Sequence, residues 1–353
     1  MSGGWQRETK AREAKASAAG DDGDRRLSAP LGQGEALQRW LRQARQLRLP
    51  HGFLVEGRRG SGKSTVVAWL VAALLCPSDL DPDGPCGICR TCTRIANDLH
   101  PDVRVLDLAH DERDRKEQKK SFYVITVDQV RQAQSALARH AVEGRARVLW
   151  ITAADHLDEE GQNALLKTLE EPGAATFLLL EAARPEQLLP TVRSRVQRLR
   201  VLPLDAGTLQ REFLRRLPTQ GHRAATAAGV AGGSLGLALE ACTERTVQLH
   251  DLVRELLAEP HRLRPVEVTN AVLHGISERR LELAAAGTFL WLLRAELQRT
   301  LDALADHADP AYVARALEPW TTWLELVLAA ERDLDLLIPP EQVLTVCLLQ
   351  FGS

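Results

Sequence analysis

At 353 residues, the chain exceeds the size of one ordinary hydrophobic core, so we expect two or three domains. Its 44% hydrophobic and 26% charged residues and its formal net charge of -2 are typical of a soluble globular protein, and they argue against a dedicated DNA-coating protein. No apolar run is long enough to span a bilayer, and the polar start of the chain does not resemble a signal peptide. We therefore expect a cytoplasmic protein with no membrane partner.

The N-terminal half of the chain has two distinct patterns. Residues 1–28 are rich in Ala, Gly, Asp, Arg and Lys without apolar periodicity, which predicts a disordered tail. From about residue 29 to 204, helical and strand patterns alternate, with a charged run at 110–120 that we interpret as a solvated loop. The predicted helices are 35–47, 62–75, 127–141 and 159–171, and the predicted strands are 53–56, 103–108, 148–151 and 177–180. This alternation predicts an α/β fold in which a parallel sheet has helices on both faces.

The C-terminal part of the chain has a different pattern. After Leu204 the strand signal ends, and helical periodicity carried by Leu and Ala continues to the end. We expect an all-α region made of a small lid followed by a bundle of four or five helices.

Residues 57–64 read G-R-R-G-S-G-K-S and match the phosphate-loop pattern G-x-x-x-x-G-K-[ST] between a strand and a helix. The glycines allow backbone N–H groups to converge on phosphate oxygens at the helix N-terminus, where Lys63 reaches the outer phosphates and Ser64 ligates Mg²⁺. The alternative is a glycine-rich turn that happens to precede a helix. The sequence predicts binding of ATP or ADP with Mg²⁺ by Gly57, Gly60, Gly62, Lys63, Ser64 and Thr65.

The strand at 148–151 lacks the carboxylate that hydrolysis requires. Phosphoryl transfer needs a Mg²⁺-holding Asp and a residue that orients water, and both normally follow a strand next to the loop. Here the strand leads into Thr152 and Ala153, and the nearest carboxylate, Asp155, comes three residues late. We therefore predict a chain that holds a nucleotide without hydrolysing it, with Asp155 as a possible substitute.

Four cysteines in 17 residues form the pattern C-x9-C-x2-C-x2-C, with proline and glycine turns between them. Two C-x2-C steps can place thiolates about 2.3 Å from one tetrahedral zinc ion. Buried free thiols or a redox pair are the alternatives. The sequence predicts a structural zinc site, because four thiolates leave no open coordination position, with the ligands Cys76, Cys86, Cys89 and Cys92.

Two segments after the third predicted strand carry further information. Residues 163–172 read N-A-L-L-K-T-L-E-E-P, and residues 191–196 read T-V-R-S-R-V. Taken alone, the first is equally well an amphipathic helix stopped by proline, and the second a basic surface turn.

Together, the phosphate loop, the cysteine insert, the helix at 163–172 and the pair Ser194-Arg195 resemble the clamp-loader family of AAA+ ATPases, which serves bacterial DNA polymerase III. The closer resemblance within it is to the delta-prime type of subunit. The resemblance is strong over about 29–204 and rests only on helical content and length beyond that. It implies an AAA+ core at 29–204 with a zinc insert at 76–92, a helical lid at 205–245 and a collar at 246–353.

The resemblance also implies partners and one catalytic role. The collar would join this chain to gamma/tau motor and delta subunits in a hetero-pentameric ring, which loads the sliding clamp onto primed DNA. In this family the Ser-Arg pair presents an arginine finger to the nucleotide of an adjacent motor subunit. Arg195 is therefore the predicted catalytic residue, acting in trans, and Arg193 is the alternative.

Three departures from the motor subunits indicate a non-hydrolysing subunit. Motor subunits carry an Asp-Glu pair where this chain has Thr152-Ala153, a Thr in the region of 182–183 and an Arg near Gly236. The intact phosphate loop points the other way, since many delta-prime chains have lost theirs. The cysteine that commonly follows the Ser-Arg pair is Val196 here.

Two alternatives remain beside the non-hydrolysing subunit. The chain is a motor subunit of the same ring that uses Asp155 in an unusual geometry, or it is an unrelated P-loop zinc protein such as a nucleotide kinase or signalling switch.

Overall fold

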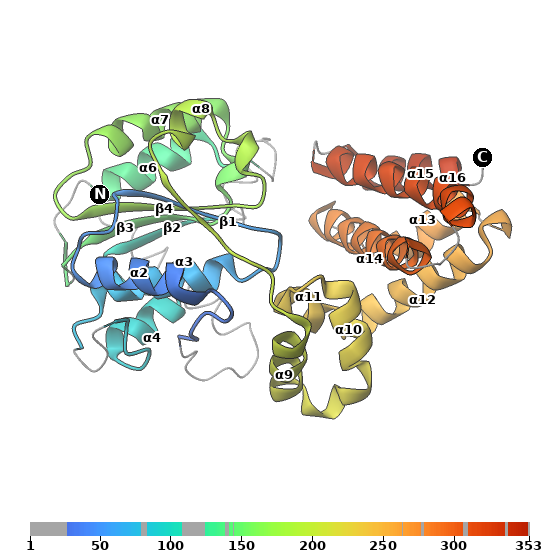
Figure 1. Cartoon of the computed structure of the whole chain (residues 1–353). Coiled ribbons are helices and arrows are strands. Elements are labelled where there is room, and N and C mark those ends of the chain that lie inside the picture. The colour runs from blue at the N-terminus through green and yellow to red at the C-terminus, as the bar shows by residue number, and fades with distance from the viewer. Residues whose placement is uncertain are drawn as a thin grey trace. The chain divides into compact units, whose positions relative to one another are not determined.

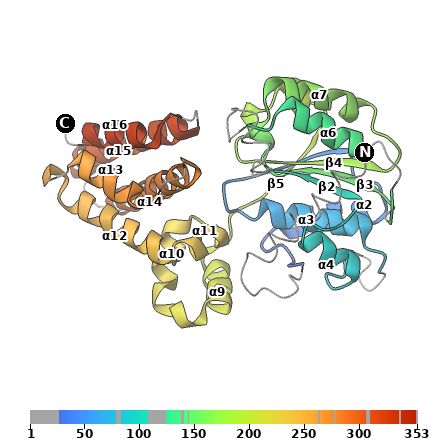
Figure 2. The same cartoon turned by 180° about the vertical axis from the view of Figure 1, so that it is seen from behind.

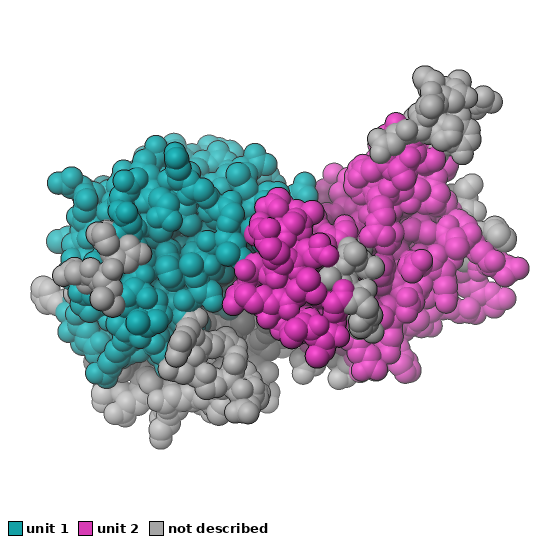
Figure 3. All heavy atoms as spheres, turned by 60° about the horizontal axis from the view of Figure 1, so that its bottom comes forward, with its two compact units in different colours: residues 1–204 teal, residues 205–353 magenta. Residues whose placement is uncertain are grey.

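The computed structural model describes residues 27–78, 83–107, 124–137, 141–143, 145–262, 264–276, 279–305, 310–335 and 338–351. Within them the chain divides into two compact units, with the boundary between Leu204 and Asp205 (Figure 3). Most of the expected tail (1–28) and all of the expected charged loop (110–120) lie outside the described residues.

In the described part of the first unit, five parallel strands form one sheet in the order β2-β3-β4-β1-β5. The strands are β1 (Gly52–Glu56), β2 (Val103–Leu106), β3 (Arg147–Ile151), β4 (Thr176–Ala182) and β5 (Gln197–Arg200). β1 lies between β4 and β5, so the loop that follows Glu56 starts at the carboxyl edge of the sheet, between two neighbouring strands. Ligands of open α/β sheets bind at this edge.

Helices cover both faces of the sheet (Figures 1 and 2). One face carries α2 (Gly34–Arg45), α3 (Lys63–Leu75) and α4 (Arg90–Ala96), and the other carries α6 (Val127–Leu137), α7 (Glu159–Glu170) and α8 (Pro190–Arg193). Successive strand residues alternate between the two faces: Phe177 and Leu179 pack with α3, whereas Leu178 and Leu180 pack with α7. The predicted α/β core is confirmed.

Local sequence explains where α7 begins and ends. The Asp158 side chain accepts a hydrogen bond from the Gly161 backbone N–H at 2.6 Å, which satisfies one of the free N–H groups of the first turn. Leu165 and Leu169, four residues apart, are buried against the sheet. Pro172 follows the last turn, where it cannot continue the helix.

All described elements after Leu204 are helical. They are α9 (Ala206–Arg216), α10 (Ala224–Ala231), α11 (Leu235–Glu240), α12 (Glu244–Ala258), α13 (Pro265–Leu273), α14 (Arg279–Ala305), α15 (Pro310–Asp335) and α16 (Pro340–Phe351), with short 3-10 turns between some of them. The long helix α14 packs against α12, α15 and α16. The expected all-α C-terminal region is confirmed. Among the described residues, no helix has both the length and the apolar character that a membrane crossing requires.

Candidate nucleotide and metal sites

The phosphate loop occupies the turn between β1 and α3, and its glycines are required there. Gly60 and Gly62 have φ angles of 72° and 92°, in the left-handed region that strains other residues. A side chain at Gly57 would meet the Ser61 Oγ at 2.9 Å and the Val201 carbonyl at 3.0 Å. The glycine spacing found in the sequence therefore serves the backbone path of the loop.

Lys63 and Ser64 begin α3 at the end of this loop. The Lys63 Nζ donates hydrogen bonds to the carbonyls of Gly57 (2.9 Å) and Arg58 (3.0 Å), so the ammonium lies across the loop. Burial lowers the pKa of Lys63, and the negative charges of Glu181 and Asp155 oppose that shift. The Ser64 hydroxyl donates to the Glu181 Oε2 at 2.9 Å. A cation and a hydroxyl thus stand at a helix N-terminus, as phosphate and Mg²⁺ binding require.

Glu181 is a functional candidate that the sequence prediction missed. It lies on β4 with only 2% of its surface exposed, and its Oε1 accepts a 2.7 Å hydrogen bond from the Trp150 indole N–H. Burial raises the pKa of Glu181 to about 7, against the lowering effects of the hydrogen bonds from Ser64 and Trp150 and of the Lys63 charge. The buried carboxyl is therefore poised to change its charge near neutral pH.

This shift predicts a pH-dependent stability. The folded-state pKa of Glu181 is raised above its ordinary value of 4.5, so the folded chain binds the extra proton between these two values. Stability must therefore fall as pH rises from about 4.5 through 7 and level off above. Glutamine does not titrate, so Glu181→Gln lacks this loss of stability. Without Mg²⁺ or nucleotide, we expect its free energy of unfolding minus that of wild type to be about 2–3 kcal/mol larger at pH 8 than at pH 5.

Urea unfolding of both proteins across this pH range measures the difference directly. Taking the difference between the two proteins cancels the titration of groups that both contain and that do not interact with Glu181. A constant difference between pH 5 and pH 8 would contradict the raised pKa.

The end of β3 lacks the usual Mg²⁺-holding carboxylate. The Thr152 hydroxyl donates a hydrogen bond to Asp107 Oδ1 at 3.2 Å, and Ala153 has no polar side chain. Asp155 is buried, and its Oδ2 accepts hydrogen bonds from the backbone N–H groups of Ala183 (3.1 Å) and Arg184 (3.0 Å). The Asp155 carboxylate therefore binds the backbone after β4, which gives it a structural role there.

The four cysteines of the insert converge in space. Cys76 follows α3, Cys89 is the N-cap of α4, and Cys92 is buried within α4. Their Sγ atoms all lie within 4.8 Å of one another, and three separations are 3.7, 3.8 and 4.0 Å. Zinc–sulfur bonds of about 2.3 Å in a tetrahedron require sulfur–sulfur edges of about 3.8 Å. The cluster can therefore hold a metal ion of this kind.

Backbone groups support the same arrangement. The Cys89 N–H points at the Cys86 Sγ at 3.3 Å, and Gly87 between them has a φ of 74°, which allows the tight turn. Burial raises the pKa of the Cys92 thiol, and the charge of Cys76 raises it further. Four thiolates at this spacing would repel one another in the absence of a cation. A bound cation reverses that balance because thiolates are its ligands.

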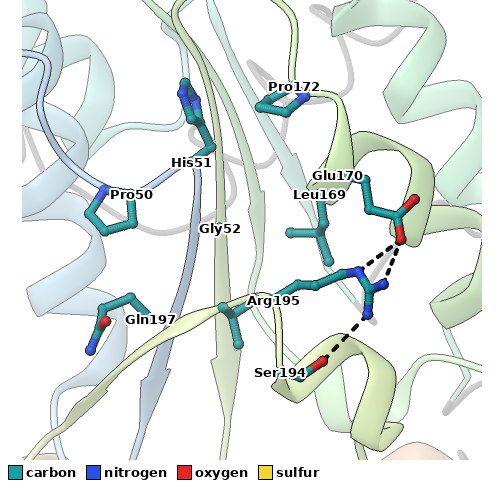
Figure 4. A pocket seen from close by; sticks show the side chains of 10 residues that line it. Pro50, His51, Gly52, Leu169, Glu170, Pro172, Ser194, Arg195 and Gln197 are labelled. Carbon is teal, nitrogen blue, oxygen red and sulfur yellow. Dashed lines mark hydrogen bonds and ion pairs between the residues drawn. The ribbon is translucent and has the colours of Figure 1, made fainter.

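Arg195 lies at the amino edge of the sheet, between α8 and β5. Its Nε and Nη2 contact the Glu170 Oε1 at 2.9 and 2.7 Å (Figure 4). Its Nη1 donates to the Thr191 carbonyl at 3.0 Å. Arg195 and Glu170 line a surface pocket of about 420 Å³ together with Pro50, His51, Gly52, Leu169, Pro172, Ser194, Val196 and Gln197. The alternative finger, Arg193, is half-buried in the last turn of α8.

The structure separates the predicted residues into three places. The nucleotide residues share one turn at the carboxyl edge of the sheet, the cysteines cluster at the end of α3, and Arg195 stands at the opposite edge. Sequence reasoning missed Glu181 and Glu170, which contact Ser64 and Arg195.

Comparisons with known proteins find similarity to subunits of DNA polymerase III. Residues 32–205 match the family model described as "DNA polymerase III, delta subunit". The DNA polymerase III subunit delta' of Escherichia coli is 36% identical over 192 residues, 54% of this chain and 53% of that protein. The subunit delta' of Pseudomonas aeruginosa is 34% identical over 172 residues, 48% of this chain and 49% of that protein. The chain therefore spans about half the length of these curated relatives.

Further similarities extend to gamma/tau subunits of DNA polymerase III. The DNA polymerase III subunit gamma/tau of Mycobacterium tuberculosis is 30% identical over 158 residues, 44% of this chain and 25% of that protein. A solved gamma-subunit-related protein from Thermotoga maritima aligns with 91% of this chain and 98% of its own at 16% identity and a TM-score of 0.47. The predicted similarity to delta-prime subunits is confirmed.

Proposed function

We propose that this chain, whose residues 32–205 match the family model "DNA polymerase III, delta subunit", is a delta-prime-type subunit of a bacterial clamp loader. It joins gamma/tau motor subunits and a delta subunit in a hetero-pentameric ring in the cytoplasm. The ring loads the sliding clamp onto primed DNA. In it, this chain acts without hydrolysing ATP itself and supplies Arg195 to a neighbouring motor subunit.

The position of Arg195 is the observation that carries this proposal. Arg195 stands where β5 begins, whereas the chain's own phosphate loop follows the end of β1, beside β5. Five residues of β1, at about 3.3 Å each, separate the two edges by about 16 Å. The guanidinium therefore cannot reach a nucleotide in its own loop, but 37% of its side chain is exposed to a neighbour.

Glu170 holds the guanidinium in the isolated chain. Both groups are partly exposed, so this ion pair is weak and easily exchanged. A phosphate at a subunit boundary carries more negative charge than one carboxylate and can accept two parallel N–H bonds from arginine. In the ring, Arg195 exchanges Glu170 for the phosphoryl group of the adjacent nucleotide.

The absence of hydrolysis follows from the end of β3. Thr152 and Ala153 offer no base to orient water. The Asp155 carboxylate is already hydrogen-bonded to backbone N–H groups after β4. The four cysteines hold structural zinc, which joins the end of α3 to α4. Within the second unit, residues 205–245 form the lid and 246–353 the collar.

Reconstitution with the motor and delta subunits of the same organism tests the proposal. We expect the purified chain to bind ATP with no turnover, to enter the complex and to raise the ATP hydrolysis of the mixture. The similarity to gamma/tau subunits favours one other reading, a hydrolysing motor. Turnover by the chain alone that Asp155→Asn abolishes would establish that reading, and failure to enter the complex would leave an unrelated P-loop protein.

A further inference from the structure

Glu181 occupies the position where a Mg²⁺ ligand is needed. In a phosphate loop, the hydroxyl that begins the helix binds the cation of the nucleotide, and a strand carboxylate completes the site. Ser64 supplies the hydroxyl here, but the residue after β3, where the carboxylate belongs, is Thr152. The acceptor of the Ser64 hydrogen bond is instead the Glu181 Oε2 at 2.9 Å.

Strand order and alternation place Glu181 there. β4 lies between β3 and β1, and Leu180 pairs with Ile151, so Glu181 comes one residue beyond the paired end of β3. Phe177 and Leu179 face α3, and the period of two puts Glu181 on that same face. The carboxylate therefore reaches the phosphate loop from the strand next to β3, on the side where a β3 carboxylate would project.

A purely structural role explains this carboxylate poorly. Its two oxygens accept one hydrogen bond from Ser64 and one from Trp150. A glutamine could accept the Trp150 bond with its amide oxygen and donate its amide N–H to the Ser64 hydroxyl, without placing an acid in a site only 2% exposed. The Trp150 bond fixes the orientation of the carboxylate, and Lys63 is close enough for its charge to act on it. A fixed buried carboxylate beside a phosphate loop is suited to a divalent cation.

We propose that Glu181, from β4, replaces the missing β3 carboxylate and holds with Ser64 the Mg²⁺ of a bound nucleoside di- or triphosphate. This inference rests on the proposed function only in assigning the loop to nucleotide binding. Because no residue at 152 or 153 orients water, this site retains the Mg²⁺–nucleotide without using it. The nucleotide is then a stable part of the subunit.

Equilibrium binding of fluorescent ADP and ATP to the full chain, with Mg²⁺ and with EDTA, tests the proposal. For wild type, we expect Mg²⁺ to tighten binding, and for Glu181→Gln we expect that gain to fall by about 10- to 100-fold while the affinity in EDTA stays unchanged. Asp155→Asn is the matched control, because its carboxylate binds backbone N–H groups, and it should keep the full gain.

A spectroscopic measurement guards against a folding defect in the variant. Mn²⁺ added with ADP to wild type should give a protein-bound electron paramagnetic resonance signal that both Glu181→Gln and Ser64→Ala weaken. An unchanged Mg²⁺ gain in Glu181→Gln would overturn the role of Glu181 and leave the phosphate loop assigned. Equal loss of binding in EDTA would also overturn it. If wild type binds no nucleotide, the inference fails, but the proposed role of Arg195 stands.

Discussion

In a reconstituted clamp loader, Arg195→Ala should slow ATP hydrolysis at the one boundary that this chain serves by about 10³-fold or more. An arginine supplied in trans stabilises charge on the transferring phosphoryl group, and its effect elsewhere is about 10³ to 10⁵ in rate. The variant changes only this boundary, so the steady-state rate of the complex should fall only by the fraction of ATP hydrolysis that occurs there. Single-turnover hydrolysis resolves the loss as a missing fast phase.

The chain offers two matched controls for this variant. Arg193→Ala removes a guanidinium from the same turn, two residues away, and should leave the fast phase intact. Glu170→Gln removes the carboxylate that holds Arg195. This variant should keep the fast phase of hydrolysis or make it faster, because the guanidinium is then free to reach the adjacent nucleotide. A full fast phase in Arg195→Ala would show that the finger is assigned wrongly, and its loss only in Arg193→Ala would transfer the role.

Sequence alone predicts the central strands well, and the reason is burial. β1, β3 and β4 are apolar runs because both of their faces are covered, so their residues read as strands without any knowledge of neighbours. β5 was missed because it lies at the edge of the sheet, where only Leu199 of its four residues is buried. The short helix α4 was missed because cysteine positions, and no apolar period, define it.

The candidate sites divide in the same way. The phosphate loop is contiguous in the chain, and the cysteines lie within 17 residues, so their spacing alone predicts that they meet. The contact between Ser64 and Glu181 joins residues 117 positions apart, and it depends on strand order and on which face of β4 a residue occupies. Local spacing in the sequence predicts neither the strand order nor the face of β4. From the sequence, Glu181 was therefore only the polar end of an apolar strand.

The pair Glu170 and Arg195 shows an intermediate case. Both residues belong to segments that the sequence analysis singled out, but their contact spans 25 positions and arises because α7 ends beside the turn that precedes β5. The residues of a site were thus predictable from motifs, whereas the partners that hold those residues required the fold.

Replacing Cys89 with serine is expected to remove the metal and to destabilise the N-terminal unit severely. Structural zinc binds zinc-finger peptides with about 10–16 kcal/mol, and that energy is folding energy because the site does not exist in the unfolded chain. Loss of even part of it rivals the 5–15 kcal/mol that stabilises a whole domain. Here the four thiols join the end of α3 to α4, so both helix ends should loosen.

The matched control is Cys347→Ser, in α16 of the other unit. Cys347 is also buried, and burial raises its pKa to about 12, so it is a core thiol that tests the general cost of serine at a buried cysteine. Metal analysis and thermal unfolding of the three proteins should give one zinc equivalent for wild type and Cys347→Ser, and none for Cys89→Ser. A chelator should lower the unfolding temperature of wild type toward that of Cys89→Ser. One equivalent of zinc retained by Cys89→Ser, with unchanged unfolding, would mean that these four thiols bind no structural zinc, and that the turns and the α3–α4 packing order the insert by themselves.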